Sequence, residues 1–247
     1  MWPGNAFIAL GVLVLASFSV YHVQAKRKWD KLEPEINKFY PGGHYIMLTF
    51  NDALDSTLTP KLLDILNEKK IRVTLFVQGK DVEANKGLIT RARDERHEIA
   101  NYGWDLESKS TSPADEEIVD QVARTSKAVE EITGKKTSVY RPPSKPSTAF
   151  KYTSQHAQLV GTGGPQHASP PQVILHSLNA DNNGDATESS AIAETIITKA
   201  QKGDVVMCHL TAHSVEAVVR VVDKLTEEGY EFLTLSEVMS FPDDKPH

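Results

Sequence analysis

Five places along the chain put polar side chains directly after short apolar runs. These places are Asn51-Asp52, Tyr102, Arg141, Asp181 and His209. Aspartate and histidine are side chains that proteins commonly use as general bases, general acids and metal ligands. If the apolar runs are parallel strands of a barrel, these residues gather at the carboxyl ends of the strands, where a barrel has its site.

The elements that would position these residues alternate between strand and helix. Apolar runs predict strands at 45–50, 73–77, 98–102, up to Arg141, 159–161, 173–178, 205–209 and 231–235. Helical spacing and helix-start signals predict helices near 59–66, 87–93, 112–134, 189–200 and 215–229. This alternation is typical of parallel βαβ units. The predicted fold class is therefore α/β, a single distorted (β/α) barrel of seven or eight units.

The composition of the 247 residues is that of a globular chain, with 40% hydrophobic and 24% charged residues. These proportions exclude a disordered chain, a collagen-like repeat and a protein with many membrane spans. The 33 acidic side chains outnumber the 27 lysines and arginines, for a formal charge of −6, so no basic face is expected to bind nucleic acid. Cys208 is the single cysteine, which excludes a disulfide within the chain.

The first 25 residues differ from the rest because they contain no lysine, arginine, aspartate or glutamate. Residues 6–20 form an apolar run that suits the core of a signal peptide better than a membrane-spanning helix, which needs about 20 residues. Cleavage after Ala25 would remove it, but the basic Lys26-Arg27-Lys28 that follows also fits a retained anchor. We therefore expect entry into the secretory pathway and an extracellular or cell-surface location, with a membrane-anchored protein as the alternative.

The polar strand ends lie within a series of ordered motifs. In chain order these are Thr49-Phe50-Asn51-Asp52-Ala53, Arg96-His97-Glu98-Ile99-Ala100-Asn101, Arg141-Pro142-Pro143 and Met207-Cys208-His209. They resemble the signatures of polysaccharide deacetylases with a NodB homology domain, the chitin deacetylase group of carbohydrate esterases. The resemblance covers roughly residues 44–238. It divides the chain into a signal peptide or anchor at 1–25, an irregular linker at 26–43, a NodB-like domain at 44–238 and a tail at 239–247.

The resemblance implies removal of N-acetyl groups from N-acetylglucosamine polymers such as chitin. In that family a divalent metal, commonly zinc, is held by one aspartate and two histidines and polarises the acetamide carbonyl and a water molecule. A second aspartate takes the proton of the water, and a histidine protonates the leaving amine. An arginine orients the base, and a further aspartate supports the acid histidine.

This chain departs from that pattern at the base and at the metal ligands. The base position is Asn51, whose amide does not accept a proton from water at neutral pH. The metal aspartate is present as Asp52, but Tyr102 and Leu106 stand where the two metal histidines belong. One carboxylate does not hold a catalytic zinc, so we expect no metal cofactor here. Tyr102 and Trp104 are expected either to stack on a sugar ring or to fill the vacated space.

The resemblance also assigns the remaining site positions. Arg141 matches the arginine that orients the base, Asp181 the supporting aspartate, and His209 the acid histidine. A substitute metal site is the alternative, with zinc or another divalent metal held by Asp52 and a histidine from elsewhere. His209 and His213 are four residues apart, but no acidic residue lies between them. His156 and His167, in an irregular stretch, are further candidates for such a ligand.

Three functions follow from these positions. The leading hypothesis is a catalytically inactive deacetylase-like protein whose groove binds an N-acetylated, chitin-like glycan or a protein partner. The alternative is an active metal-dependent hydrolase of a non-peptide C–N bond that uses a substitute metal site. A structural protein of the cell surface, with the barrel as scaffold, is the third. Contact with a membrane is expected only through the N-terminal segment, and the sequence leaves the oligomeric state open.

Overall fold

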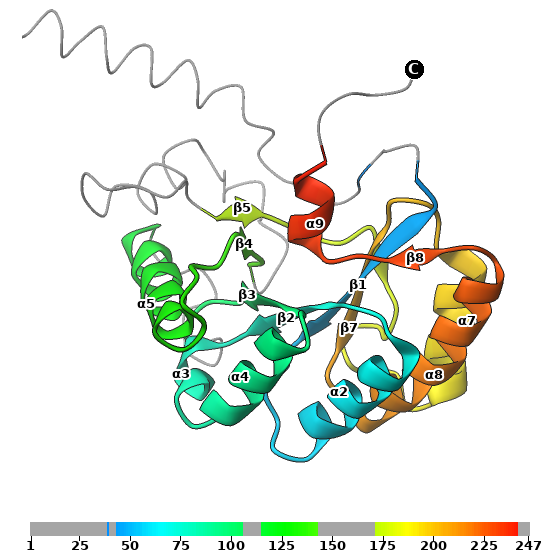
Figure 1. Cartoon of the computed structure of the whole chain (residues 1–247), viewed down its shortest axis with the longest axis horizontal. Coiled ribbons are helices and arrows are strands. Elements are labelled where there is room, and N and C mark those ends of the chain that lie inside the picture. The colour runs from blue at the N-terminus through cyan, green and yellow to red at the C-terminus, as the bar shows by residue number, and fades with distance from the viewer. Residues whose placement is uncertain (1–38, 40–42, 106–114, 143–170, 242–247) are drawn as a thin grey trace, which may run out of the picture.

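A computed structural model describes residue 39 and residues 43–105, 115–142 and 171–241 (Figure 1). The predicted leader at 1–25, the strand-like run at 159–161 and Leu106 lie outside these residues. Within the described part of the chain, no helix has both the length and the apolar character needed to cross a membrane.

A sheet of parallel strands forms the inside of the fold. Its order is β5-β4-β3-β2-β1-β7-β6, and β8 pairs separately with β1. The strands are β1 (Tyr45–Asn51), β2 (Thr74–Val77), β3 (Glu98–Asn101), β4 (Val139–Tyr140), β5 (Gln172–Val173), β6 (Leu178–Asn179), β7 (Val205–His209) and β8 (Glu231–Phe232). These parallel strands with helices around them confirm the predicted distorted (β/α) barrel.

Helices cover the outer side of this sheet, except for the last one, which packs on the interior core cluster (Figure 1). They are α2 (Leu58–Lys69), α3 (Gly79–Val82), α4 (Lys86–Asp94), α5 (Asp115–Thr133), α7 (Ser189–Lys199), α8 (Ala212–Glu227) and α9 (Leu235–Met239). The longer of these helices follow the predicted periodicity. The short helices α3 and α9 are additions that the sequence patterns did not predict.

Alternation along the central strands separates the two sides of the sheet. On β1, Ile46, Leu48 and Phe50 belong to the core that the outer helices share. Met47 lies in a second core cluster, inside the barrel. Because side chains alternate along a strand, Asn51 falls on the same inner side as Met47. The period of two thus directs the last residue of β1 into the barrel interior.

The predicted strand at 173–178 is wrong, because this run forms two short strands at opposite edges of the sheet. β5 pairs with β4, and β6 pairs with β7. Between them the chain crosses the opening of the barrel: the Ile174 N–H donates to the Tyr140 carbonyl (2.9 Å), and the Ser177 N–H donates to the Val205 carbonyl (3.1 Å). An apolar run indicates that its residues are buried, but not which strand they pair with. The local pattern alone therefore does not show that this run divides into two strands.

The predicted strand at 231–235 is also too long. β8 ends at Phe232, and Thr234 caps α9 through a capping box in which the Thr234 N–H donates to Glu237 Oε2 (2.9 Å). Leu235 and Val238 of α9 then fill the interior cluster. The Thr-x-x-Glu signature of this cap is readable in the sequence and marks the true helix start.

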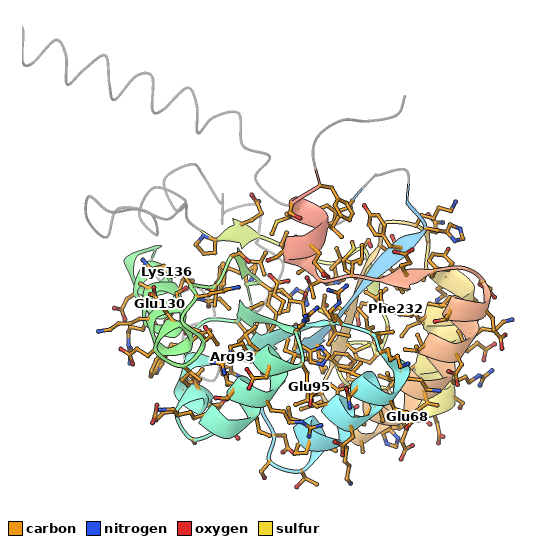
Figure 2. The ribbon with its side chains drawn as sticks, viewed as in Figure 1. Glu68, Arg93, Glu95, Glu130, Lys136 and Phe232 are labelled. Carbon is orange, nitrogen blue, oxygen red and sulfur yellow. The ribbon has the colours of Figure 1, made fainter. Side chains whose placement is uncertain are left out.

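His97 is a buried titratable group in the layer between sheet and helices. Its Nδ1 accepts a hydrogen bond from the Val73 N–H (3.3 Å), and its Nε2 has no hydrogen-bond partner among the described residues. Burial lowers the pKa of His97 to about 4; Arg91 and Arg72 add to this, and the Glu95 carboxylate, 3.8 Å from Nε2, opposes it. Glu95, labelled in Figure 2, lies directly after α4.

This lowered pKa predicts acid sensitivity. The unfolded chain takes up a proton at His97 below about pH 6.5, whereas the folded chain does so only near pH 4. Stability should therefore fall as the pH decreases from about 6.5 to about 4, by about 3 kcal/mol from this site. Urea unfolding across this range should show a flatter profile for His97→Gln than for the parent. His213→Gln on α8 is the control, and an equal slope for both variants would contradict the assignment.

Candidate functional site

A cavity lies at the carboxyl ends of the strands. Its volume of about 540 Å³ is in the range of small-molecule sites. It is lined by Asn51, Tyr102, Arg141, Pro142, Leu175, His176, Asn179, Asn183, Met207 and His209. The structure thus brings together four of the residues that the sequence singled out: Asn51, Tyr102, Arg141 and His209.

The pairing of β1 with β7 sets the centre of the site. Asn51 and His209 are register partners at the ends of these two strands. Met207 lies two residues before His209 and therefore on the same side of β7. All three line the cavity, because the inner side of both strands ends there.

Both ends of the Asn51 side-chain amide contact neighbouring side chains. Its Nδ2 donates to the Tyr102 hydroxyl (2.9 Å) and lies 3.3 Å from Sδ of Met207. Its Oδ1 accepts from Nη1 of Arg141 (2.9 Å). Only 1% of Asn51 is exposed. The position that the family resemblance gives to a proton-accepting carboxylate is therefore a neutral amide inside a closed hydrogen-bond network.

Tyr102 stands where the family resemblance predicts the first metal histidine. The residue is buried, and its ring packs edge-on against Phe76, with centroids 6.4 Å apart. Burial raises the pKa of the Tyr102 hydroxyl, and the Asp52 charge raises it further. The phenol consequently stays protonated at neutral pH, and its oxygen already accepts the hydrogen from Asn51.

Asp52 turns away from this network. It is exposed, its φ of 52° is left-handed, and its Oδ1 accepts a hydrogen bond from Gln78 Nε2 (2.6 Å). It does not line the cavity. The second histidine position, Leu106, lies outside the described residues.

These donors do not fit a catalytic divalent metal. Such a site needs three protein ligands and an open position, whereas the described chain offers one exposed carboxylate and one protonated phenol here. Among the described residues, no group of three His, Cys, Asp or Glu side chains is placed to hold a metal ion.

Arg141 is the most connected side chain of the site. It is 2% exposed, and it donates to Thr49 Oγ1 (2.9 Å), Asn51 Oδ1 (2.9 Å) and the carbonyls of Ile174 (3.3 Å) and Leu175 (2.8 Å). Its guanidinium also stacks over the buried ring of Phe76, with Cζ 3.9 Å from the ring centroid. Burial lowers the pKa of Arg141 to about 9, so the group remains charged at neutral pH. In the described part of the chain no carboxylate accepts from it.

His209 and Asp181 form a separate pair on one wall. Nδ1 of His209 lies 3.2 Å from Oδ1 of Asp181, and the His209 backbone N–H donates to Oδ2. The Gly184 N–H also donates to Oδ1 (3.1 Å). The turn that permits this runs through left-handed residues at Asn182, Asn183 and Gly184. Asp181 is 1% exposed, whereas 19% of the His209 side chain reaches solvent.

The sequence missed several residues of the cavity, including Leu175, His176, Asn183 and Met207. The alternation on β7 would have found Met207, and the Asn-Asn-Gly turn signal would have pointed to Asn183. Trp104 does not line the cavity, because the Arg124 guanidinium covers its ring at 4.0 Å from the centroid. Of the two aromatic residues considered for sugar stacking, only Tyr102 reaches the cavity.

Comparison with known proteins gives several relatives that are named as deacetylases. The polysaccharide deacetylase family model matches residues 40–159. A peptidoglycan-N-acetylglucosamine deacetylase from Bacillus cereus is 28% identical over 203 residues, which cover 79% of this chain and 88% of the relative. A peptidoglycan-N-acetylglucosamine deacetylase from Listeria monocytogenes is 28% identical over 197 residues, or 78% of this chain, but the match spans only 38% of that longer protein.

The similar solved structures include some that are described as CE4 family pseudoenzymes. A CE4 family pseudoenzyme from Bacillus anthracis superimposes with a TM-score of 0.71 at 21% identity, covering 85% of this chain and 70% of the other. A mutant of a CE4 family pseudoenzyme with restored enzymatic activity gives a TM-score of 0.72 at 22% identity, with coverages of 85% and 72%. At these identities the likeness establishes the shared fold.

No described carboxylate neutralises Arg141, and this predicts that an aspartate beside it would stabilise the fold. Asn51→Asp would place a carboxylate at the atom that now accepts from Nη1, and hydrogen bonds between charged groups are stronger than neutral ones. We expect the free energy of unfolding at pH 7 to rise by about 1 kcal/mol. Arg141 depresses the pKa of the new carboxyl in the folded state, so the gain should be present above about pH 4 and be lost as the pH falls through that depressed value.

Thermal and urea unfolding at pH 7 and pH 3 would measure this gain. Asn67→Asp, an exposed position on α2, makes the same chemical change away from the cavity and is the matched control. A loss of stability in Asn51→Asp at pH 7, with Asn67→Asp unchanged, would show that burial of a second charge outweighs the new pair.

Proposed function

We propose that this chain, which belongs to the polysaccharide deacetylase family, binds N-acetylated glycan in the cavity at the strand ends and does not deacetylate it. The observation that carries the proposal is the closed network around Asn51. Its amide donates to the Tyr102 hydroxyl and accepts from Arg141. A protein-internal network thus stands where the family places a base beside a metal.

Deacetylation would lack two groups at this site, the general base that accepts a proton from water and the metal that polarises the acetamide. An amide does not take a proton from water at neutral pH, and loss of a general base costs about 10²–10⁴-fold in rate. The donor set does not fit the metal that would polarise the acetamide. His209 alone, held by Asp181, protonates a leaving group only after a nucleophile has attacked, so the retained half of the machinery does not complete a reaction.

The cavity supports a binding role. Its lining combines hydrogen-bonding side chains, such as Asn183 and His209, with the apolar Leu175 and Met207. This mixture of a few polar groups with apolar surface is typical of small-molecule sites. The relatives carry the names of enzymes that act on N-acetylated peptidoglycan sugars, which supports an N-acetylated glycan as the ligand.

The same relatives support a location outside the cell. Peptidoglycan is a cell-wall polymer, so a protein that binds such a glycan would act at the cell surface or beyond it. Removal of residues 1–25 would release the domain at 44–238, and retention of that segment would anchor it to the membrane. A purely structural scaffold and an active enzyme with a substitute metal site remain as the outcomes that the experiments below separate.

Glycan binding is tested first. Calorimetric titration with N-acetylglucosamine oligomers should give saturable binding, and His209→Ala should weaken it about tenfold through loss of a hydrogen bond from the cavity wall. His213→Ala, four residues further along the chain and outside the cavity lining, is the control. Absence of binding would favour the structural scaffold. Equal effects of the two variants would indicate that the glycan binds outside this cavity.

Metal content and acetate release test the loss of catalysis. The purified chain should hold no stoichiometric zinc and release no acetate from chitin oligomers under conditions in which the Bacillus cereus relative is active. Asn51→Asp alone should not change this, because the metal ligands would still be missing. Chelator-sensitive release of acetate by the unmodified chain would establish the substitute metal site instead.

Restoring the ligands should restore the metal. Tyr102→His with Leu106→His gives Asp52 two histidine partners, and this double variant should bind zinc near one equivalent. Addition of Asn51→Asp should then recover weak deacetylation. The restored activity of the mutant CE4 pseudoenzyme supports this repair route. Tyr102→Phe with Leu106→His is the control, since it supplies too few ligands, and zinc binding by that control would contradict the proposed ligand set.

A further inference from the structure

The cavity carries the opposite charge character from the chain as a whole. The sequence has a formal charge of −6. The described residues that line the cavity nevertheless include one arginine and two histidines, at Arg141, His176 and His209, and no aspartate or glutamate. Among the described residues, the lining of this cavity is thus free of acidic side chains although the chain as a whole is acidic.

The positive charge at its base is not neutralised. All four hydrogen bonds of Arg141 go to uncharged oxygens, in Thr49, Asn51 and the carbonyls of Ile174 and Leu175. Where an active relative would place an aspartate, Asn51 keeps the hydrogen bond but carries no charge. A buried cation without an opposite charge is costly, and a carboxylate brought to it lowers that cost.

Arg141 also has donor capacity left. A guanidinium has five N–H groups, and four hydrogen bonds are present: one from Nε, two from Nη1 and one from Nη2. Within the described residues, one N–H of Nη2 is therefore unused. Arg141 lines the cavity, so a ligand oxygen bound there would lie next to this charge.

The nearest acidic groups do not supply the missing charge. Asp181 is occupied by three donors, which are Nδ1 and the backbone N–H of His209 and the backbone N–H of Gly184. Asp52 is exposed and bonded to Gln78. Neither lines the cavity. Nδ1 of His209 is held by Asp181, so Nε2 is the ring nitrogen that remains for a ligand.

We propose that the cavity favours a ligand carboxylate, and that among N-acetylated glycans it binds an acidic sugar more tightly than a neutral one. The carboxylate replaces, from the ligand, the charge that Asn51 no longer provides to Arg141. This inference rests on the proposed glycan-binding function, and it names the class of sugar that the same site takes.

A sugar with a free carboxylate and its neutral methyl ester test the selection. The probes are N-acetylmuramic acid, which is the 3-O-lactyl ether of N-acetylglucosamine, and its methyl ester, titrated into the full chain by calorimetry. The free acid should bind about tenfold or more tightly than the ester, because hydrogen bonds to charged groups exceed neutral ones by this much. Lactate alone is the third probe, since it carries the carboxylate without the sugar.

Asn51→Asp provides the decisive variant. It gives Arg141 an internal carboxylate, so the ratio of the two affinities should collapse toward one. Asn67→Asp on α2 adds the same charge to the chain away from the cavity and should keep the ratio of the parent. Circular dichroism of both variants would verify that they are folded before the ratios are compared.

Each outcome decides the inference. A preference for the free acid that Asn51→Asp abolishes supports it. Equal binding of acid and ester overturns it and leaves the glycan-binding function intact. Binding of lactate without binding of either sugar supports the carboxylate site and overturns the glycan-binding function, whereas no binding of any probe overturns both.

Discussion

The buried guanidinium of Arg141 holds together the two parts of the barrel that the sheet itself does not join. β5 and β6 lie at opposite edges of the sheet, and the segment between them crosses the opening. Arg141 follows β4 and donates to Thr49 and Asn51 on β1 as well as to two carbonyls of the crossing segment. One side chain therefore fixes the central strand relative to the segment that completes the barrel, and it forms the base of the cavity in doing so.

This dual role explains how the site would keep its shape if, as we propose, it has lost its catalytic chemistry. Asn51 is nearly the same size as aspartate and still accepts from Nη1 of Arg141, so the contact between β4 and β1 survives the substitution. Tyr102 adds a hydroxyl that accepts the second amide hydrogen bond of Asn51. What changes is charge, because an amide satisfies a donor without neutralising it. The fold needs the hydrogen bonds, whereas catalysis needs the charge and the proton affinity of a carboxylate.

The sequence predicted those parts of the site that depend on local pattern. Their positions at the carboxyl ends of β1 and β7 were sufficient to predict Asn51 and His209 in one site, because the ends of parallel strands meet at the same face of a barrel. The crossing segment at 174–177 could not be predicted in this way, since its apolar run has the composition of one strand and its partners are far away in the chain. Trp104 was ambiguous for a similar reason. Its ring is covered by Arg124 from α5, which only the packing of that helix reveals.

The retained pair of His209 and Asp181 has a structural reason to persist that is independent of catalysis. Asp181 accepts the backbone N–H of His209 and of Gly184, so its carboxylate closes the left-handed turn and joins it to the end of β7. Removing that carboxylate would take away the acceptor of the part-buried His209 N–H, at a cost of about 1–3 kcal/mol, whereas the Gly184 N–H would keep its bond to the Asp181 backbone carbonyl. The contact to the imidazole is one of three that Asp181 makes. An acid and its supporting aspartate can thus remain in place after the base and the metal ligands are gone, and their presence alone is not evidence of an active enzyme.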